Sequence, residues 1–521
     1  MRSNLVIGLA ALSAGLITPA TAVPSLQVDT TSGRAYGMLN GSNPNVAQFL
    51  GIPYGEAPVG ALRFSPPKLK LPVGDIDATK SGPNCPQYYS NNVTQYPTVY
   101  GFDAPFLQPL PGWSEDCLNL NVWAPYTPHA NRSELLPVII WIFGGGFYEG
   151  GTNTLGFDAS YWVQRSQTHI VVAMNARVNI FGFPNSRGLA ETNENVNVGL
   201  LDQRLALEWT RDNIEAFGGD PSRMVVWGQS SGSASTDYLN YAYPDDPIVG
   251  GFIQHSGSVF ATGESSDAQM LNFTSVAEHV GCGNRSAAAE LDCMRYNASA
   301  EDIINFYEEY NLNPTEGALK FTTIVDGITK FSNYTERALA GNFSQLPVIS
   351  GTNGHEMASL NGWPGPSGPN MTDLALTTLS HQQCPENYNT GLRAHLNTTT
   401  FRYLNNASFP NISPRWWEGA YHTSELPLLF GTYAVYENAL ATALEAATSA
   451  KWQDLYVAFA RDPVNALPAL GWPEYSPGPE GKVWMWNPRG EGGEVTAVGG
   501  LIAAEDVVRP CEGVEWTISE P

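Results

Sequence analysis

The pentad Gly-Gln-Ser-Ser-Gly at residues 228–232 contains the side chain best suited to chemistry in this sequence. It fits the pattern Gly-x-Ser-x-Gly and directly follows the apolar run 224–227. A strand that runs into such a pentad makes a sharp, strained turn, in which the glycines avoid clashes and the serine hydroxyl stands exposed above the sheet. Ser230 is therefore a candidate nucleophile. Because the pentad also occurs by chance, this interpretation needs the other parts of an acyl-transfer site in the right order.

A glycine triplet at residues 144–146 follows the apolar run 136–142. Glycines let a backbone approach a ligand closely and point N–H groups at it. In acyl transfer a negative oxygen develops on the attacked carbonyl, and fixed N–H donors stabilise it. We expect Gly145, Gly146 and the N–H of Ser231 to form this oxyanion hole. The alternative, a flexible glycine turn, is less attractive because the triplet precedes the pentad.

The acid and the base are sought downstream, since α/β-hydrolases place them in the order serine, acid, histidine. Glu356 ends the segment 351–356, which follows the apolar run 346–349. A carboxylate holds the tautomer of the base and stabilises its cation. Glu356 is therefore the candidate acid, although an exposed loop glutamate is the commoner fate of this residue type.

Three histidines follow Glu356 at some distance, and one of them is expected to be the base. His381 and His395 lie in polar segments, where a solvated histidine is the default. His422 lies in a glycine-containing loop before an apolar run, and His355 adjoins the candidate acid and is expected to point away from it. We therefore expect His422 to take the proton of Ser230.

These residues follow short apolar runs that are typical of strands buried on both faces. The runs are 136–142, 170–174, 224–227 and 346–349, and a stretch with helical apolar spacing lies at 200–217. Strand, helix and strand in this order predict βαβ units and an α/β fold. In such folds the site lies beyond the carboxyl ends of the strands, which is where the glycine triplet, the pentad and the segment 351–356 begin.

With these residues in place, the sequence closely resembles the type-B carboxylesterase and lipase family, the cholinesterase-like α/β-hydrolases. It is most similar to the secreted fungal carboxylesterases and lipases, and the likeness covers nearly the whole chain. The matching blocks are residues 51–64, 115–122, 197–203, 217–221, 351–356 and 419–426.

The resemblance implies an α/β-hydrolase fold, with a large, mostly parallel central sheet covered by helices on both faces. It implies Ser230 as nucleophile, Glu356 as acid and His422 as base, with no cofactor and no metal. It also implies a supporting pair of residues near the histidine loop, Ser256 and Glu425. The enzyme expected from these parts is a serine carboxylic-ester hydrolase that works through an acyl-enzyme.

Six cysteines indicate an oxidising compartment, and sequence alone allows 15 pairings. The resemblance supports one set of three disulfides: Cys85–Cys117, Cys282–Cys293 and Cys384–Cys511.

One departure from the family bears on the substrate. The residue before the nucleophile is Gln229, where the family usually has glutamate. In cholinesterases that glutamate adds negative charge near a cationic substrate. We therefore expect uncharged carboxylic esters to be preferred over choline esters.

Residues 1–22 have the charged start, apolar centre and small-residue cleavage site of a signal peptide, so residues 23–521 are predicted to form one secreted domain. The net charge of −24 argues against nucleic acid and anionic membranes as partners, and we expect no stable membrane anchor. N-linked glycans are expected on some of the sequons, which begin at Asn40, Asn92, Asn131, Asn272, Asn284, Asn297, Asn333, Asn342, Asn370, Asn397, Asn406 and Asn411.

The segment between Cys85 and Cys117 is rich in aromatic residues and leaves two interpretations open. In this family the loop borders the active-site opening, and in the fungal lipases it acts as a lid. A mobile lid would make the protein an interfacially activated triacylglycerol or sterol-ester lipase, whereas a fixed wall would suit small soluble or aromatic esters. Polar residues interrupt the loop, which favours the fixed wall. A third alternative is a non-catalytic adhesion or binding role, which some family members have.

Overall fold

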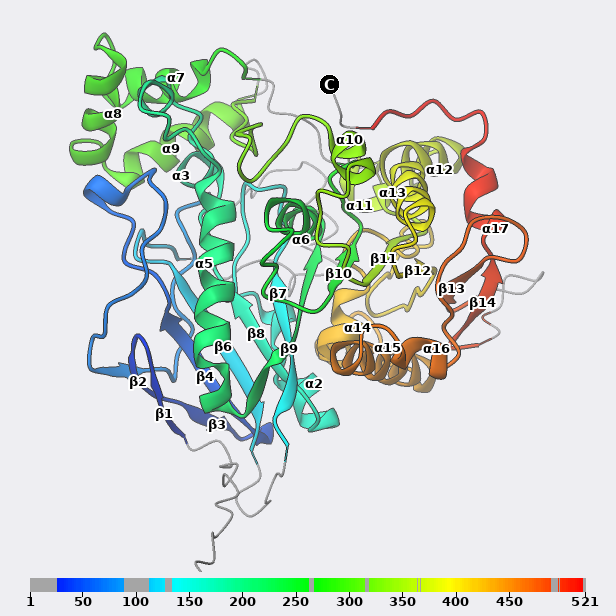
Figure 1. Cartoon of the computed structure of the whole chain (residues 1–521). Coiled ribbons are helices and arrows are strands. Elements are labelled where there is room, and N and C mark those ends of the chain that lie inside the picture. The colour runs from blue at the N-terminus through cyan, green and yellow to red at the C-terminus, as the bar shows by residue number, and fades with distance from the viewer. Residues whose placement is uncertain are drawn as a thin grey trace, which may run out of the picture.

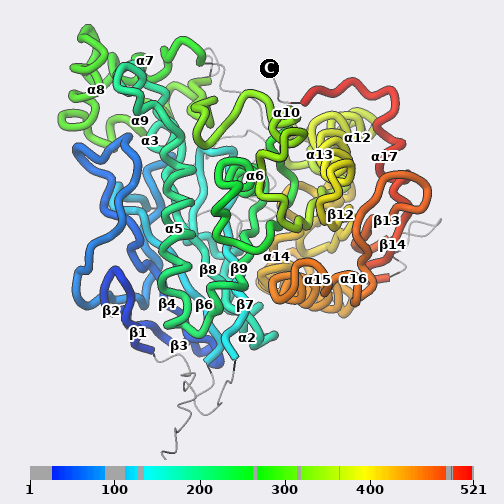
Figure 2. Tube along the Cα trace, viewed as in Figure 1, coloured from blue at the N-terminus to red at the C-terminus, as the bar shows by residue number. Residues whose placement is uncertain are grey.

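The central sheet positions every candidate residue. The computed structural model describes residues 26–88, 112–126, 134–261, 267–313, 318–362, 364–365, 367–488, 495 and 497–518. The predicted signal peptide and most of the aromatic loop, residues 89–111, lie outside these ranges. The sheet has eleven strands in the order β14-β13-β12-β11-β10-β9-β7-β8-β6-β4-β3. The N-terminal and C-terminal strands lie at opposite edges of it (Figure 2).

The middle of the sheet, from β8 to β13, is parallel, and antiparallel pairs occur at both edges. A separate small sheet has the order β1-β2-β5. The strands are β1 (Gln27–Thr30), β2 (Gly33–Tyr36), β3 (Met38–Asn40), β4 (Asn43–Pro53), β5 (Asp75–Asp77), β6 (Asn119–Pro125), β7 (Leu136–Ile142), β8 (Ile170–Met174), β9 (Gly219–Gln229), β10 (Phe252–His255), β11 (Val348–Asn353), β12 (Thr400–Asn405), β13 (Lys482–Trp486) and β14 (Gly499–Ala503).

Helices surround this sheet, and α7, α8 and α9 gather at one end of the molecule (Figure 1). The helices are α2 (Ser160–Ser166), α3 (Asn179–Gly182), α4 (Arg187–Glu191), α5 (Val198–Asn213), α6 (Ser231–Ala242), α7 (Leu271–His279), α8 (Ala287–Tyr296), α9 (Ala300–Leu312), α10 (Tyr334–Leu339), α11 (Met357–Leu360), α12 (Met371–Thr378), α13 (Cys384–His395), α14 (Leu426–Phe430), α15 (Ala443–Arg461), α16 (Ala466–Ala469) and α17 (Glu505–Val508). Among the described residues, no helix is long and apolar enough to cross a bilayer.

Both faces of the sheet are covered, as the alternation along β7 shows. Val138 and Ile140 pack in one core with Trp209 of α5, while Ile139 and Trp141 pack in a second core with Trp452 of α15. Successive side chains of a strand point to opposite faces, so a strand apolar at every position needs a layer on each side. The expected mostly parallel sheet with helices on both faces is confirmed.

Three of the predicted elements differ in extent from those observed. The run 224–227 lies inside the longer strand β9, and the run 346–349 overlaps β11, which begins at Val348. The predicted helix 200–217 is α5 followed by the 3-10 turn Ile214–Phe217. Gly218, with φ 88°, ends that turn, and β9 starts at the next residue.

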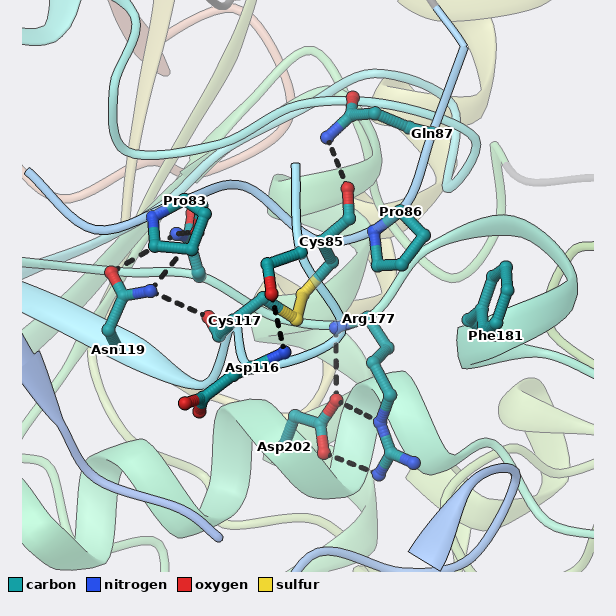
Figure 3. Close-up of a disulfide and its surroundings, with 12 residues drawn as sticks. Pro83, Cys85, Pro86, Gln87, Asp116, Cys117, Asn119, Arg177, Phe181 and Asp202 are labelled. Carbon is teal, nitrogen blue, oxygen red and sulfur yellow. Dashed lines mark hydrogen bonds and ion pairs between the residues drawn. A yellow bond between two sulfur atoms is a disulfide. The ribbon is translucent and has the colours of Figure 1, made fainter. Parts of the chain in front are cut away.

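The structure contains the three disulfides that the resemblance implied, Cys85–Cys117, Cys282–Cys293 and Cys384–Cys511. The first closes the base of the aromatic loop and lies near the buried ion pair between Arg177 and Asp202 (Figure 3). That pair is bidentate, with nitrogen-to-oxygen distances of 2.8 and 2.7 Å. At the described ends of the loop, Tyr88 packs edge-on against Tyr307 of α9. Because residues 89–111 are not described, the choice between lid and wall stays a prediction.

One buried carboxyl group of α13 makes stability depend on pH. Burial raises the pKa of Glu386 to about 7, although Arg402 lowers it. The pKa of this carboxyl group is higher in the folded chain than in the unfolded chain. Its contribution to stability is therefore fully present at a pH below the pKa of the unfolded chain, and it is lost as the pH rises through about 7. Glu386→Gln keeps the neutral shape at every pH. When the pH is raised from 5 to 8, the free energy of unfolding of the wild type should therefore fall by about 2–3 kcal/mol more than that of the variant.

Urea unfolding midpoints of both proteins at pH 5 and pH 8 measure this effect. Equal pH dependence in the two proteins would contradict it.

Candidate active site

Ser230 occupies a strained turn between β9 and α6. Its backbone has φ 58° and ψ −127°, a region that costs a non-glycine residue about 1–3 kcal/mol. The turn is fixed because the Ser230 N–H donates to the carbonyl of His255 at 2.8 Å. A Cβ at Gly228 would contact the Gly232 carbonyl, and a Cβ at Gly232 would contact the Ile142 carbonyl. The pentad therefore forms the elbow expected from the sequence, and both glycines are needed for its close packing.

The glycine triplet lies against this elbow. A Cβ at Gly144 would come within 2.6 Å of the Gln229 carbonyl, so the loop can lie this close to the elbow only because residue 144 is a glycine. Gly145 and Gly146 have φ values of 131° and 63°. Within the described chain their N–H groups donate no hydrogen bond, and Ser231 is the first residue of α6, where backbone N–H groups have no partner in the helix. The three proposed oxyanion donors are thus N–H groups left available beside Ser230.

A carboxyl group also lies beside this loop. Burial raises the pKa of Glu149 to about 7, so this side chain is mainly neutral in weakly acidic solution. Its neutral form places no negative charge near the position where an oxyanion would develop.

Glu356 and His422 meet behind the elbow, and both are almost completely buried. His422 Nδ1 lies 2.6 Å from Glu356 Oε2. The other carboxylate oxygen accepts from Ser256 Oγ at 2.5 Å and from the Asn353 N–H at 2.6 Å. Both oxygens of Glu356 thus act as hydrogen-bond acceptors, and the one that faces His422 requires a proton on Nδ1. The imidazole is therefore held in the tautomer in which Nε2 has a lone pair.

The side chain of Gln229 lies within hydrogen-bond distance of that nitrogen. Its Nε2 lies 3.0 Å from His422 Nε2, and the Gln229 side chain is buried. An amide N–H can donate to the neutral imidazole, whereas a glutamate here would favour the imidazolium.

Ser230 opens into a cavity of about 260 Å³. Gly146, Phe147 and Ser231 line it on the side of the oxyanion loop and α6, and Lys320 and Thr323 line it from the segment before α10. The structure thus brings together Ser230, the glycine loop, His422 and Glu356. It keeps His381 exposed on a turn after α12 and places His395 at the end of α13.

A second buried network adjoins the first, and Glu425 is the only one of its members that was named from the sequence. His255 Nδ1 lies 3.2 Å from Glu425 Oε1, and His255 Nε2 lies 2.6 Å from the Tyr456 hydroxyl. Asn353 joins the two networks, because its N–H donates to Glu356 and its side-chain amide donates to Glu425 Oε2 at 2.6 Å. The available signal was the polar end of β10, which parallel strands bring to the same edge as Ser230.

This geometry also separates two residues that the resemblance had paired. Ser256 donates to Glu356, while Glu425 binds Asn353 and His255. No hydrogen bond joins Ser256 to Glu425 in the described structure. Ser256 therefore belongs to the hydrogen-bond network of Glu356, and Glu425 belongs to that of His255.

A parallel sheet covered on both faces, with a strained serine elbow at the end of its central strand, defines an α/β-hydrolase. The chain belongs to the carboxylesterase family, whose model matches residues 24–363. It is 41% identical over 462 residues to a chlorogenic acid esterase of Aspergillus niger, covering 88% of this chain and 87% of that protein. It is 40% identical over 483 residues to secreted lipase 5 of Gibberella zeae, covering 88% and 89%.

A more distant relative is an acetylcholinesterase of Electrophorus electricus, 36% identical over 342 residues, which are 64% of this chain and 52% of that enzyme. The predicted enzyme class is confirmed: the chain is a carboxylic-ester hydrolase. A non-catalytic adhesion role is not favoured by these relatives.

Gln229→Glu is expected to move the acid limb of the pH profile of kcat/KM to higher pH by about one unit. The reason is that a carboxylate at the Gln229 position, 3.0 Å from His422 Nε2, would stabilise the protonated imidazole, which cannot accept the serine proton. Gln229→Met is the matched control, since it fills similar space without charge and should leave the limb in place. Superimposable profiles for the glutamate variant and the wild type would contradict this role.

Proposed function

We propose that this protein is a secreted serine esterase in which Ser230 is the nucleophile, His422 the general base and Glu356 the acid that orients it. The observation that carries the proposal is the 2.6 Å contact between His422 Nδ1 and Glu356 Oε2, beside a strained serine elbow. A serine hydroxyl is a weak nucleophile until a neighbouring base takes its proton, and the base needs a fixed tautomer.

In this mechanism Ser230 Oγ attacks the ester carbonyl while its proton passes to His422 Nε2. The carbonyl oxygen becomes negative, and the N–H groups of Gly145, Gly146 and Ser231 stabilise it. The imidazolium then gives its proton to the leaving alcohol as the C–O bond breaks. Water attacks the acyl-enzyme by the same route in reverse and releases the acid, so the proton balance closes without a cofactor.

We propose small or aromatic carboxylic esters as the substrates, rather than long-chain lipids. The cavity at Ser230 is small, at about 260 Å³, and several polar groups line it, including Ser231, Lys320 and Thr323. The Aspergillus niger relative is named for chlorogenic acid, which makes that ester a candidate substrate here. The Gibberella zeae relative keeps an interfacial lipase as the second candidate.

Secretion is proposed from the signal-like residues 1–22 and from the relatives that are named secreted. N-linked glycans on the sequons are proposed on the same ground. Exposed examples in the described structure include Asn284 and Asn342.

A panel of p-nitrophenyl esters of rising acyl length, extended with chlorogenic acid and simple phenolic acid esters, tests the proposal. We expect kcat/KM to be highest for short acyl chains and aromatic acids. A jump in rate where a long-chain substrate passes its solubility limit would favour the lipase instead. Inactivity on every ester would refute both.

A further inference from the structure

An exposed lysine borders the cavity at Ser230, and neither the family assignment nor the proposed mechanism uses its charge. Lys320 lines the same cavity as Ser230. Among the described residues that line this cavity, Lys320 is the only one with a charged side chain. The whole chain has 26 lysines and arginines against 50 acidic residues, so a chance neighbour would more often be acidic.

The fold directs Lys320 toward the cavity. Leu319 and Phe321, on either side of it, are buried in the core formed with α7, α8 and α9. Lys320, Thr322 and Thr323, on the same segment, all line the cavity. The Lys320 carbonyl accepts from the Asn272 side chain at 3.0 Å, which fixes the backbone at this point.

Hydrogen-bond donors continue along this wall. Thr323 also lines the cavity, and the ammonium group of the buried Lys330 donates to its hydroxyl oxygen at 3.3 Å. The Thr323 hydroxyl also lies 3.3 Å from the Tyr238 hydroxyl, so its proton goes either to Tyr238 or to a ligand in the cavity. The wall therefore offers a cation and hydroxyl donors, which is the set that a carboxylate, an acceptor-only group, requires.

None of the described residues that line the cavity is acidic, and the carboxyl group that lies beside the oxyanion loop is that of Glu149, whose pKa burial raises to about 7. The Glu356 oxygens are occupied by His422, Ser256 and Asn353, and Glu356 does not line the cavity. The residue before the nucleophile is the neutral Gln229.

We propose that Lys320 and the Thr322–Thr323 wall form a subsite for a carboxylate carried by the substrate, away from the ester group that reacts. This inference rests on the proposed function of the Ser230 site. Uncharged esters remain substrates, and an ester with a second, free carboxylate in its acyl or its alcohol part is the better one.

Two matched substrate pairs test the subsite on the secreted full-length protein. On the alcohol side, 4-acetoxybenzoate is compared with 4-acetoxybenzamide. On the acyl side, the phenyl monoester of glutaric acid is compared with its terminal amide. We expect the anionic member of at least one pair to have a kcat/KM about three- to fivefold higher, the size of a partly exposed charge pair, and the ratio to fall as salt is added.

Lys320→Met should bring this ratio close to one, Lys320→Glu should reverse it, and Lys320→Arg should restore it. Lys68→Met is the matched control, because it removes one exposed lysine that does not line the cavity, and it should keep the wild-type ratio. Hydrolysis of both pairs without any preference for the anion would overturn the subsite and leave the proposed function intact. Failure to hydrolyse phenyl acetate would instead count against the proposed function.

Discussion

Ser230→Ala lowers kcat by roughly 100,000-fold or more on every ester, if Ser230 is the nucleophile. The loss is large because alanine lacks the Oγ that forms the acyl-enzyme in the proposed mechanism. A small residual rate remains, since the oxyanion donors and substrate binding are still present. Steady-state hydrolysis of p-nitrophenyl butyrate at high enzyme concentration measures the effect.

A matched serine distinguishes chemistry from folding. Ser235 lies on the same helix, α6, and its hydroxyl bonds to the Ser231 carbonyl at 2.9 Å without lining the cavity. Ser235→Ala should retain activity within a few fold. Ser230→Ala should melt close to the wild type, because the strain at residue 230 is held by backbone contacts that alanine keeps. Ser235→Ala also removes the acceptor of the buried Gln203 amide and should melt somewhat lower while it stays active. Activity that survives Ser230→Ala would remove the nucleophile assignment.

The central strands could be predicted from the sequence because burial on both faces leaves a strong local signal. β7 and β8 have the bounds of their apolar runs, 136–142 and 170–174, since no solvent-facing residue interrupts them. The elbow was equally visible, because its strained turn admits few residue types and follows directly on such a run. These two facts located Ser230 and the edge of the sheet where its partners lie.

The second network could not be predicted, because its signals are not local. β10 is only four residues long and ends in Gln254 and His255, so its apolar pattern is too short to mark a strand. The partners of Asn353 and His255 lie 72 and 170 residues away in the chain. The parallel pairing of β10 and β11 brings His255 and Asn353 to one edge of the sheet, and Glu425 reaches both from the start of α14.

Glu356→Gln is expected to lower kcat by roughly 10,000-fold while the protein stays folded. Two donors, the Ser256 hydroxyl and the Asn353 N–H, point at one oxygen of Glu356. They require that the amide oxygen of the new glutamine faces them, which leaves its NH₂ group facing His422 Nδ1. An NH₂ group there favours the tautomer with the proton on Nε2, and that nitrogen can then no longer accept the proton of Ser230.

The same substitution at the second buried carboxylate is the matched control. In Glu425→Gln, the Asn353 amide fixes the oxygen of the new glutamine, and the NH₂ group faces His255 Nδ1. His255 can change tautomer at little cost, because its other nitrogen faces the Tyr456 hydroxyl, which donates or accepts equally well. Activity should therefore fall only a few fold in Glu425→Gln. The opposite ranking of the two variants in kcat would show that Glu425, and not Glu356, is the acid that serves the reaction.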